Sequence, residues 1–214
     1  MRTPRQPHEP EGSQPSAMDT VRLRRLNRWQ AEGLREDLAD LYVESTVTRP
    51  GEEFHGRQEF LRRLADAVKL PGFDMLVAEA RSLTGCVFGI PVPRDGSWWQ
   101  GFDGPLPQNL EQLTASGHVF ATLETVVHPH QYARGLARRL QERLLADHEA
   151  SLGVTLVDRS EPSARAALEA WGWQDAGRVH RAQTVLCVLL LPLGERTTEH
   201  PDGLTHNDRT QRPG

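Results

Sequence analysis

The chain has 214 residues, enough for one domain with a sizeable hydrophobic core, and it carries a net charge of −4 with a pI of about 6.1. This acidic balance offers no basic surface of the kind that binds nucleic acid, so no nucleic-acid partner is expected. The longest apolar stretch, Thr184 to Leu193, is too short to cross a bilayer, so no membrane partner is expected. Neither a Cys-x-x-Cys nor a His-Glu-x-x-His spacing occurs, so no metal site is expected.

Both ends of the sequence are polar. Residues 1–19 are rich in Pro, Glu and Gln and lack the hydrophobic core of a secretory signal, and residues 194–214 have no apolar pattern. We therefore expect disordered tails at 1–19 and 194–214 around one domain at 20–193. Cys86 and Cys187 lie in apolar runs and are expected to be reduced core residues, which favours a cytoplasmic location.

The first half of the domain alternates between strand and helix patterns. Apolar residues at every second position predict strands, and apolar residues at helical spacing predict helices. A Pro-Gly pair ends each of the two helices, and an Arg81-Ser82 turn joins the last two strands into a hairpin. The predicted elements are a strand at 20–26, helices at 29–47 and 59–70, and strands at 74–80 and 83–92.

The second half begins with an irregular segment at 93–117, in which only a short helix at 108–113 is predicted. Ser160 is expected to cap the last helix, whose inner face carries small and apolar residues and which Gly172 ends. The remaining predicted elements are strands at 118–128, 154–157, 173–181 and 184–193 and a helix at 135–151.

One stretch of this half carries the clearest chemical signal. The run of β-branched and apolar residues from Val119 to Val127 is typical of a buried strand, and we expect this strand to end before Pro129. A helix is then expected to begin at Gly135. A strand, a glycine-bearing loop and a helix start present free backbone N–H groups to a phosphate, and Arg134 would add a charged contact. The spacing is that of neither a Walker loop nor a dinucleotide fingerprint.

The residue pattern of this loop resembles the acetyl-CoA pyrophosphate loop of the GNAT N-acetyltransferase superfamily, whose motif is Gln/Arg-x-x-Gly-x-Gly/Ala. Both small residues of the motif match, whereas its first position is a Tyr and Gln131 lies one place early. The six motif positions here are Tyr132, Ala133, Arg134, Gly135, Leu136 and Ala137.

A second landmark of that family follows later in the chain, where members often show Asn-x-x-Ala, then Tyr four residues after the Ala, then Gly-Phe. The spacing, the Ala and the Gly match, but the Asn and the Tyr do not. The corresponding residues are Glu161, Ala164, Leu168 and Gly172-Trp173.

The resemblance implies an α/β (α+β) fold with a mixed, mostly antiparallel central sheet flanked by helices. The element order obtained from pattern alone, β-α-α-β-β-β-α-β-α-β-β, agrees with it. It further implies an N-acetyltransferase that uses acetyl-CoA as co-substrate and transfers the acetyl group directly to an amine of a small molecule or peptide. Residues 132–137 would hold the pyrophosphate, and Val126 and Val127 would bind pantetheine through backbone groups.

Glu124 is the candidate catalytic residue. An arm of roughly 15–18 Å covers about five residues of a strand, so the thioester is expected near Glu124 to Val126. Glu124 is the only ionisable residue between Val119 and Val127, and a carboxylate on a buried strand is usually paired, hydrated or functional. Two interpretations stay open: a salt bridge to an arginine, or a general base that acts through water.

The acceptor amine is expected at the end of the central strand opposite the cofactor loop. There the break between the first two helices offers Glu52 and Glu53, which would attract a cation, and the 93–117 segment offers Trp98, Trp99 and Asp103. The competing interpretation of the tryptophans is a separate hydrophobic cluster or a dimer contact, so a homodimer is left open. For the chain as a whole, the alternative is a non-catalytic acyl-CoA-binding or partner-binding module.

Overall fold

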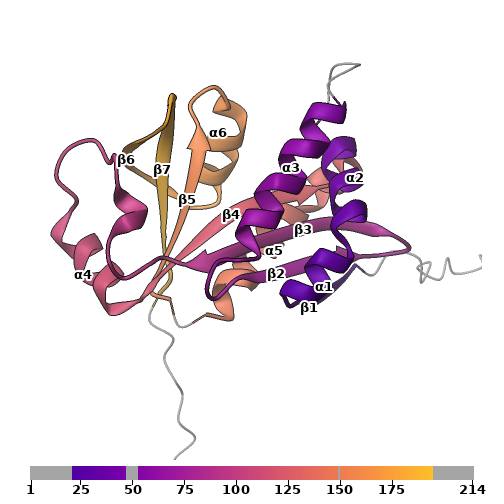
Figure 1. Cartoon of the computed structure of the whole chain (residues 1–214), viewed down its shortest axis with the longest axis horizontal. Helices are drawn as coiled ribbons and strands as arrows, with labels where there is room; N and C mark the ends of the chain where they lie inside the picture. The colour runs from indigo at the N-terminus through magenta and orange to yellow at the C-terminus, as the bar shows by residue number, and fades with distance from the viewer. Residues whose placement is uncertain (1–20, 47–52, 149, 195–214) are drawn as a thin grey trace, which may run out of the picture.

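A computed structural model describes residues 21–46, 53–148 and 150–194 (Figure 1). The tail predicted at 1–19, Glu52 and nearly all of the tail predicted at 194–214 lie outside these residues. The elements in chain order are β1 (Arg22–Leu26), α1 (Arg28–Gly33), α2 (Arg35–Thr46), α3 (Glu53–Ala67), β2 (Asp74–Glu79), β3 (Leu83–Pro91), the 3₁₀ turn η1 (Ser97–Trp99), α4 (Gln108–Ser116), β4 (Val119–Val127), the 3₁₀ turn η2 (Pro129–Arg134), α5 (Leu136–Ala146), β5 (Leu152–Asp158), α6 (Pro162–Ala170), β6 (Gln174–Arg181) and β7 (Thr184–Pro192).

The strands form one seven-stranded sheet in the order β1-β2-β3-β4-β5-β7-β6. Among the described strands, β4 and β5 pair in parallel and every other neighbouring pair is antiparallel. The predicted mixed, mostly antiparallel sheet flanked by helices is therefore confirmed.

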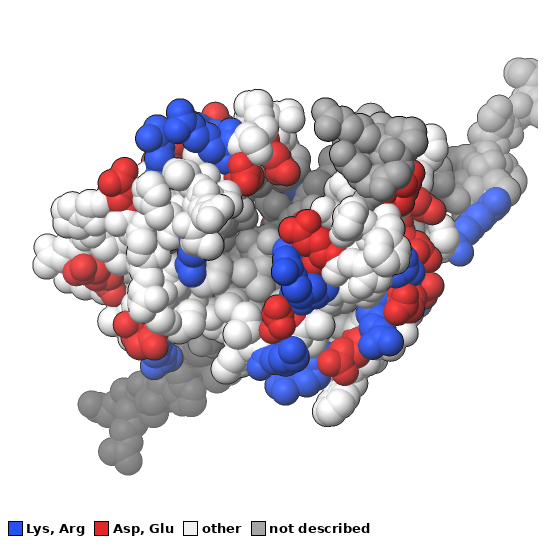
Figure 2. Space-filling view, turned by 45° about the horizontal axis from the view of Figure 1, so that its top comes forward, with Lys and Arg blue, Asp and Glu red and all other residues white. Residues whose placement is uncertain are grey.

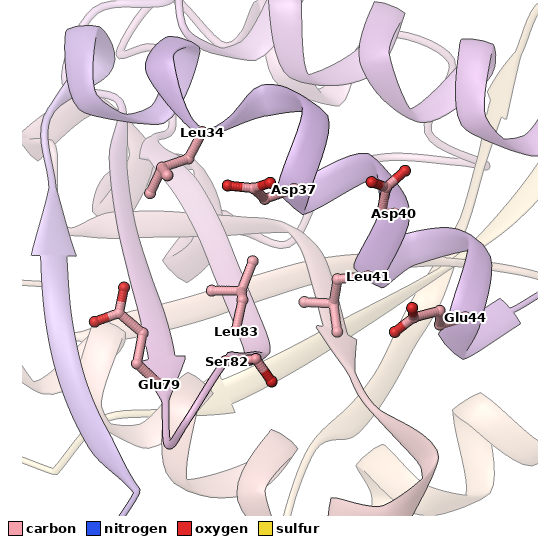
Figure 3. Close-up of a pocket in the computed structure, with 8 residues that line it drawn as sticks. All are labelled: Leu34, Asp37, Asp40, Leu41, Glu44, Glu79, Ser82 and Leu83. Atoms are coloured by element: carbon pink, nitrogen blue, oxygen red, sulfur yellow. The ribbon is translucent and has the colours of Figure 1, made fainter.

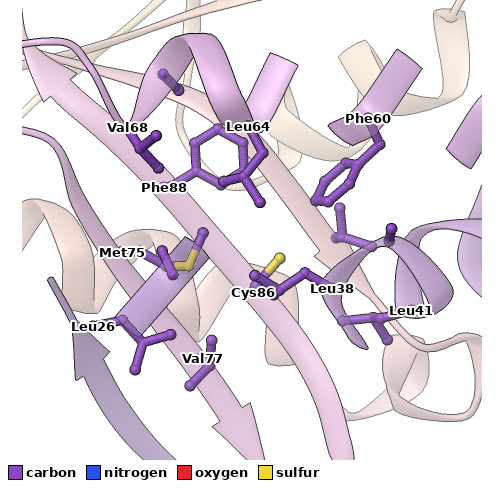
Figure 4. Packing of buried hydrophobic residues seen from close by; sticks show 14 residues of the cluster. Leu26, Leu38, Leu41, Phe60, Leu64, Val68, Met75, Val77, Cys86 and Phe88 are labelled. Carbon is purple, nitrogen blue, oxygen red and sulfur yellow. The ribbon is translucent and has the colours of Figure 1, made fainter. Parts of the chain in front are cut away.

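Helices α1, α2 and α3 cover one face of the sheet over β1 to β4 (Figures 1 and 4). The centre of this layer is aromatic: the Phe60 ring stacks on Tyr42 at 4.9 Å between centroids and meets the edge of Phe88 at 6.4 Å. Phe60 and Leu38 are fully buried, so the apolar stripes of α3 and α2 interlock above the strands. This packing fixes the position of α3 relative to β4.

Helix α5 covers the opposite face, where its leucines pack on β2, β3 and β4. Four of them are almost completely buried: Leu136, Leu140, Leu144 and Leu145. Leu168 and Trp173 join the same cluster, so α6 belongs to this layer. The segment between β3 and β4 instead forms a third cluster over β4 to β7, centred on Trp99 and Leu110.

Three local predictions are corrected. The helix predicted at 29–47 is two helices that meet at Leu34, where the backbone leaves the helical conformation directly after Gly33, a poor helix former. The helix predicted to begin at residue 59 begins at Glu53. Ser160 does not cap α6: its N–H and hydroxyl both donate to Asp158, at 2.7 Å each, and Glu161 occupies the cap position.

The sheet divides at its centre. Pairing between β4 and β5 ends at Thr122 and Thr155, although β4 continues to Val127 and β5 to Asp158. On its other side β4 bulges at the same level, because Phe88 pairs with Glu124 and Gly89 pairs with Thr122, which leaves Leu123 as an extra residue. The bulge turns β4 away from β5 and opens a space between them.

Gly89 is expected to be essential to this bulge. A Cβ there would lie 2.2 Å from the Ala121 carbonyl oxygen and 2.6 Å from the Phe120 ring, so Gly89→Ala should lower the free energy of unfolding by about 1–3 kcal/mol, measured by urea unfolding. The control is Gly33→Ala, because Gly33 is an exposed helical residue whose added Cβ would meet nothing within 4 Å. Equal stability of the two variants would show that the close approach at Gly89 is misplaced.

Candidate active site

The space between the diverging strands is a cleft of about 630 Å³. Its sides are the ends of β4 and β5, residues 122–125 and 155–158, together with residues of α5 and α6. Figure 2 shows the molecule hollowed between the lobe that carries α6 and the lobe that carries α3, with side chains of both charges along the rim.

The two long sides of the cleft differ in polarity. Helix α6 supplies an apolar wall of small and large side chains: Ala164, Ala167, Leu168 and Trp171. The facing side, from β4 and α5, carries Thr122, Thr125 and Gln141. The Gln141 amide donates to the Thr125 hydroxyl at 3.0 Å, and the Thr155 hydroxyl donates to the Thr122 carbonyl at 3.0 Å. A ligand here would need one polar edge and one apolar edge.

The mouth of the cleft is the start of α5. Gly135 adopts φ +64° and ψ 25° at the N-cap position, and no side chain caps the helix there. The first intrahelical bond runs from the Arg139 N–H to the Gly135 carbonyl at 3.1 Å, so the preceding N–H groups of the first turn have no acceptor within the helix. Gly135 and Ala137 line the cleft. This arrangement suits the phosphate of a ligand that enters the cleft.

The six motif residues contribute unequally to this mouth. Leu136 is 1% exposed and belongs to the core, so only its backbone could meet a ligand. The side chains of Tyr132, Ala133 and Arg134 lie outside the described part of the structure. An added Cβ on Gly135 would meet no atom within 4 Å, so its left-handed backbone, rather than crowding within the chain, accounts for the glycine.

The backbone of β4 has one side free along the cleft. The N–H and C=O of one residue in a strand point to the same edge, and those of the next residue point to the opposite edge. The His128 N–H donates to the Thr84 carbonyl of β3 at 2.9 Å. Val126 pairs with Cys86 in the same register, so its N–H and C=O face β3, whereas those of Thr125 and Val127 face the β5 side. Of these two residues, Thr125 lines the cleft. A backbone contact with pantetheine, predicted at Val126 and Val127, is thus geometrically open at Val127 and closed at Val126, and the Thr125 backbone is open in the same way.

Glu124 lies at the bulge on the α3 side of the sheet. Its carboxylate accepts a hydrogen bond from Nε of Arg63 at 3.0 Å, and Arg63 also lies 3.3 Å from the Glu59 carboxylate and 5.2 Å above the Tyr42 ring. Burial raises the pKa of Glu124 above its ordinary value; the Arg63 charge opposes this shift, and Glu161 and Glu59 add to it. The predicted salt bridge therefore exists, with Arg63 as its arginine. The general-base role stays a prediction.

The residues predicted for the acceptor do not gather at the cleft. Trp99 is 6% exposed and its indole N–H donates to the Thr114 hydroxyl at 2.9 Å, as expected for a separate hydrophobic cluster. Trp98 lies under the Arg181 guanidinium at 5.5 Å, and the Asp103 N–H bonds to the Arg178 carbonyl at 2.9 Å. The segment therefore packs against β6, and we no longer assign these three residues to the acceptor.

Glu53 begins α3 and is exposed. It lines a shallow hollow of about 350 Å³ with residues of α2 and α3, apart from the cleft. A further hollow of about 430 Å³ lies between α2 and the β2–β3 hairpin and collects four carboxylates: Asp37, Asp40, Glu44 and Glu79 (Figure 3). Three of them have an ionic partner: Asp40 with Arg57, Glu79 with Arg24, and Glu44 with the His128 ring at 3.7 Å.

Other kinds of site find little support in the described residues. They contain no group of three or more His, Cys, Asp or Glu side chains placed to hold a metal ion. Their helices include none with the length and apolar character needed to span a membrane. Cys86 and Cys187 are both free and buried, and burial raises the pKa of the Cys86 thiol, which makes it a poor nucleophile.

No protein-family sequence model and no curated protein sequence matches the chain. Solved structures do resemble it. A candidate acetyltransferase of the GNAT family from Desulfovibrio desulfuricans gives a TM-score of 0.52 at 19% identity, over 81% of this chain and 99% of that one. The PaiA N-acetyltransferase from Thermoplasma acidophilum, in complex with coenzyme A, gives 0.54 at 11% identity, over 82% and 100%. The chain has the GNAT fold.

A third GNAT-like neighbour is a chimera of the spermidine N-acetyltransferase SpeG from Vibrio cholerae with hSSAT. It gives a TM-score of 0.51 at 14% identity, over 81% of this chain and 96% of that chain. At these low identities the structural likeness shows the GNAT fold alone.

Sequence reasoning missed two residues of the site. Gln141 could have been noticed, because it follows Leu140 on a helix face that is otherwise apolar and turned to the sheet. Arg63 carried no such signal, because its contact with Glu124 spans 61 residues and depends on how α3 packs.

The raised pKa of Glu124 can be tested directly. We expect the Glu124 carboxyl, followed by carbon NMR, to titrate above the ordinary value of 4.5 because burial disfavours its charged form. Arg63→Gln should raise this pKa further, because it removes the cation that favours the carboxylate. Arg62→Gln is the matched control, since Arg62 is the exposed neighbour on α3. A Glu124 pKa that stays the same without Arg63 would contradict the ion pair.

Proposed function

We propose that the chain is an acetyl-CoA-dependent N-acetyltransferase that transfers the acetyl group directly to an amine in a ternary complex. The observation that carries the proposal is the cleft between β4 and β5, with the uncapped start of α5 at its mouth and Glu124 at the bulge. The GNAT fold supports it, as does the coenzyme A complex of the Thermoplasma neighbour. The buried free cysteines fit a reducing compartment, so we propose a cytoplasmic location.

Binding would follow the geometry of the cleft. The first-turn N–H groups of α5 would hold the pyrophosphate, and the pantetheine arm would run along β4 beside the peptide groups of Val127 and Thr125. The apolar wall of α6 would cover the other side of the arm and exclude water. The thioester would then lie near the bulge at Leu123, within reach of the Glu124 side of the sheet.

Glu124 would act as the general base, directly or through one water molecule. As the amine nitrogen bonds to the thioester carbon, Glu124 takes up the proton that the nitrogen loses. The Thr125 N–H would stabilise the oxyanion, which collapses to the amide as the carbon–sulfur bond breaks. The sulfur leaves as a thiolate, which a solution pKa of about 8.5 allows without a dedicated acid. Leu168, where the family pattern has a Tyr, lines the apolar wall and has no proton to give.

A second candidate is a non-catalytic acyl-CoA-binding module. Two observations favour it: Leu168 replaces the usual acid, and Arg63 already pairs with the candidate base. Thiol release measured across aminoglycosides, polyamines, amino acids and peptide N-termini separates the candidates. Release with at least one acceptor supports the enzyme, and acetyl-CoA binding without release from any of them supports the module.

Gly135→Val should raise the acetyl-CoA dissociation constant tenfold or more, about 1.4 kcal/mol, measured by calorimetry. A valine disfavours φ +64° and would add branches where the pyrophosphate approaches. Gly104→Val is the matched control, because Gly104 also has a positive φ, +90°, and an open Cβ position, but lies outside the cleft. Equal affinities for both variants would mean that the pyrophosphate loop is misassigned.

Glu124→Gln should lower turnover about 10²-fold or more, because the amide cannot accept the proton, while acetyl-CoA affinity stays within twofold. The comparison requires an acceptor from the amine panel and is made at saturating acetyl-CoA. Turnover within threefold of wild type, with only a changed melting temperature, would assign Glu124 to the salt bridge alone.

A further inference from the structure

Two polar atoms in the cleft are buried without a hydrogen-bond partner among the described residues: Oε1 of Gln141 and Oγ1 of Thr122. The two residues are 6% and 3% exposed. A buried polar oxygen that lacks a hydrogen-bond partner destabilises the folded state, so such groups in a folded protein call for an explanation. Both residues line the same cleft, which points to a ligand that supplies the missing contact.

The Gln141 side chain is held in place. It stands on the sheet-facing side of α5, where its neighbours Leu140, Leu144 and Leu145 are fully buried. Its amide nitrogen donates to the Thr125 hydroxyl at 3.0 Å, which leaves the oxygen as the group without a partner. Because the side chain is anchored at one end, its oxygen is an oriented acceptor rather than a mobile polar group.

The position of this acceptor fits one part of a coenzyme A thioester. Gln141 is six residues beyond Gly135, about 9 Å along the helix from the proposed pyrophosphate site. An extended pantetheine arm has its first amide N–H about six bonds, roughly 7–8 Å, from the phosphate, and a second one farther along. The arm also has the polar edge and the apolar edge that the cleft requires.

We propose that Gln141 is a binding residue for the pantetheine arm: its side-chain oxygen accepts a hydrogen bond from an amide N–H of the arm, and Thr125 positions it. The inference rests on the proposed use of acetyl-CoA, and it adds a side-chain contact to a site otherwise built from backbone groups. Thr122 continues the polar edge toward the point where β4 and β5 separate.

The test compares two ligands that share the nucleotide and differ in the arm. Calorimetry measures the dissociation constants of acetyl-CoA and of 3′-phospho-ADP for the wild type and for Gln141→Met, which keeps the length and removes the hydrogen bond. We expect Gln141→Met to weaken acetyl-CoA binding about tenfold and to leave 3′-phospho-ADP binding within twofold. The melting temperature of the unliganded variant should hold or rise, because an unpaired buried oxygen has been removed.

The other outcomes separate the two hypotheses. If the wild type binds acetyl-CoA and Gln141→Met binds it equally well, the role of Gln141 is overturned and the proposed function stands. If the wild type binds neither ligand, the proposed function fails and the inference fails with it. Should Gln141→Met not fold, Thr125→Val removes the positioning contact instead, and an unchanged ratio of the two affinities in that variant would equally overturn the inference.

Discussion

The separation of β4 from β5 is the constraint on which the rest of this structure depends. Parallel neighbours in the middle of a sheet normally pair along their whole length, because each unpaired backbone group that stays buried is costly. Here the pairing stops at Thr122 and Thr155 while both strands continue. Backbone N–H and C=O groups that would have bonded the neighbouring strand face a cleft instead. The cleft exists because part of the hydrogen bonding between β4 and β5 is absent.

The packing around the strands maintains this separation. The extra residue at Leu123 bends β4, and Gly89 allows the β3 backbone to approach the Ala121 carbonyl at the bend. Helix α5 holds the end of β4 from one face through its buried leucines, and α3 holds it from the other face. The α6 wall lines the β5 side. The opening is thus built into the core, as a binding site on rigid elements requires.

The ion pair between Glu124 and Arg63 affects both the cost of burying the carboxylate and its strength as a base. A carboxylate at the bulge is costly to bury, and a guanidinium at 3.0 Å offsets part of that cost. Full compensation would hold the carboxyl in its charged form and weaken it as a base, yet its pKa remains raised because burial outweighs the Arg63 charge. Burial and the ion pair thus act in opposite directions on the Glu124 pKa, and the raised pKa is the one that the proposed base would need.

The sequence predicted the parts of the fold that local chemistry determines. All seven strands are predicted, most within one or two residues, because periodicity and turn residues mark them. The helix start at Gly135 is predicted because leucines at helical spacing follow it, and its left-handed backbone agrees with a glycine there. Contacts between residues far apart in the sequence could not be predicted. Arg63 reaches Glu124 only after α3 has packed, and the 93–117 segment was assigned to an acceptor site although its Phe102 bridges to Val179 of β6.

The candidate site depends mainly on backbone groups, and this explains why few of its contacts can be predicted from the sequence. A pyrophosphate held by the N–H groups of a helix start needs a particular backbone conformation, and that demand falls on small residues such as Gly135 and Ala137. A pantetheine arm that bonds to strand backbone needs only that β4 be unpaired along one edge. That feature cannot be predicted from the side chains of β4. Gln141 is different, because a polar side chain on an apolar helix face is visible both in the sequence and in the structure. The proposed backbone contacts would make no demand on the side chain at the first motif position, whereas the proposed contact of Gln141 would make a demand specific to this chain.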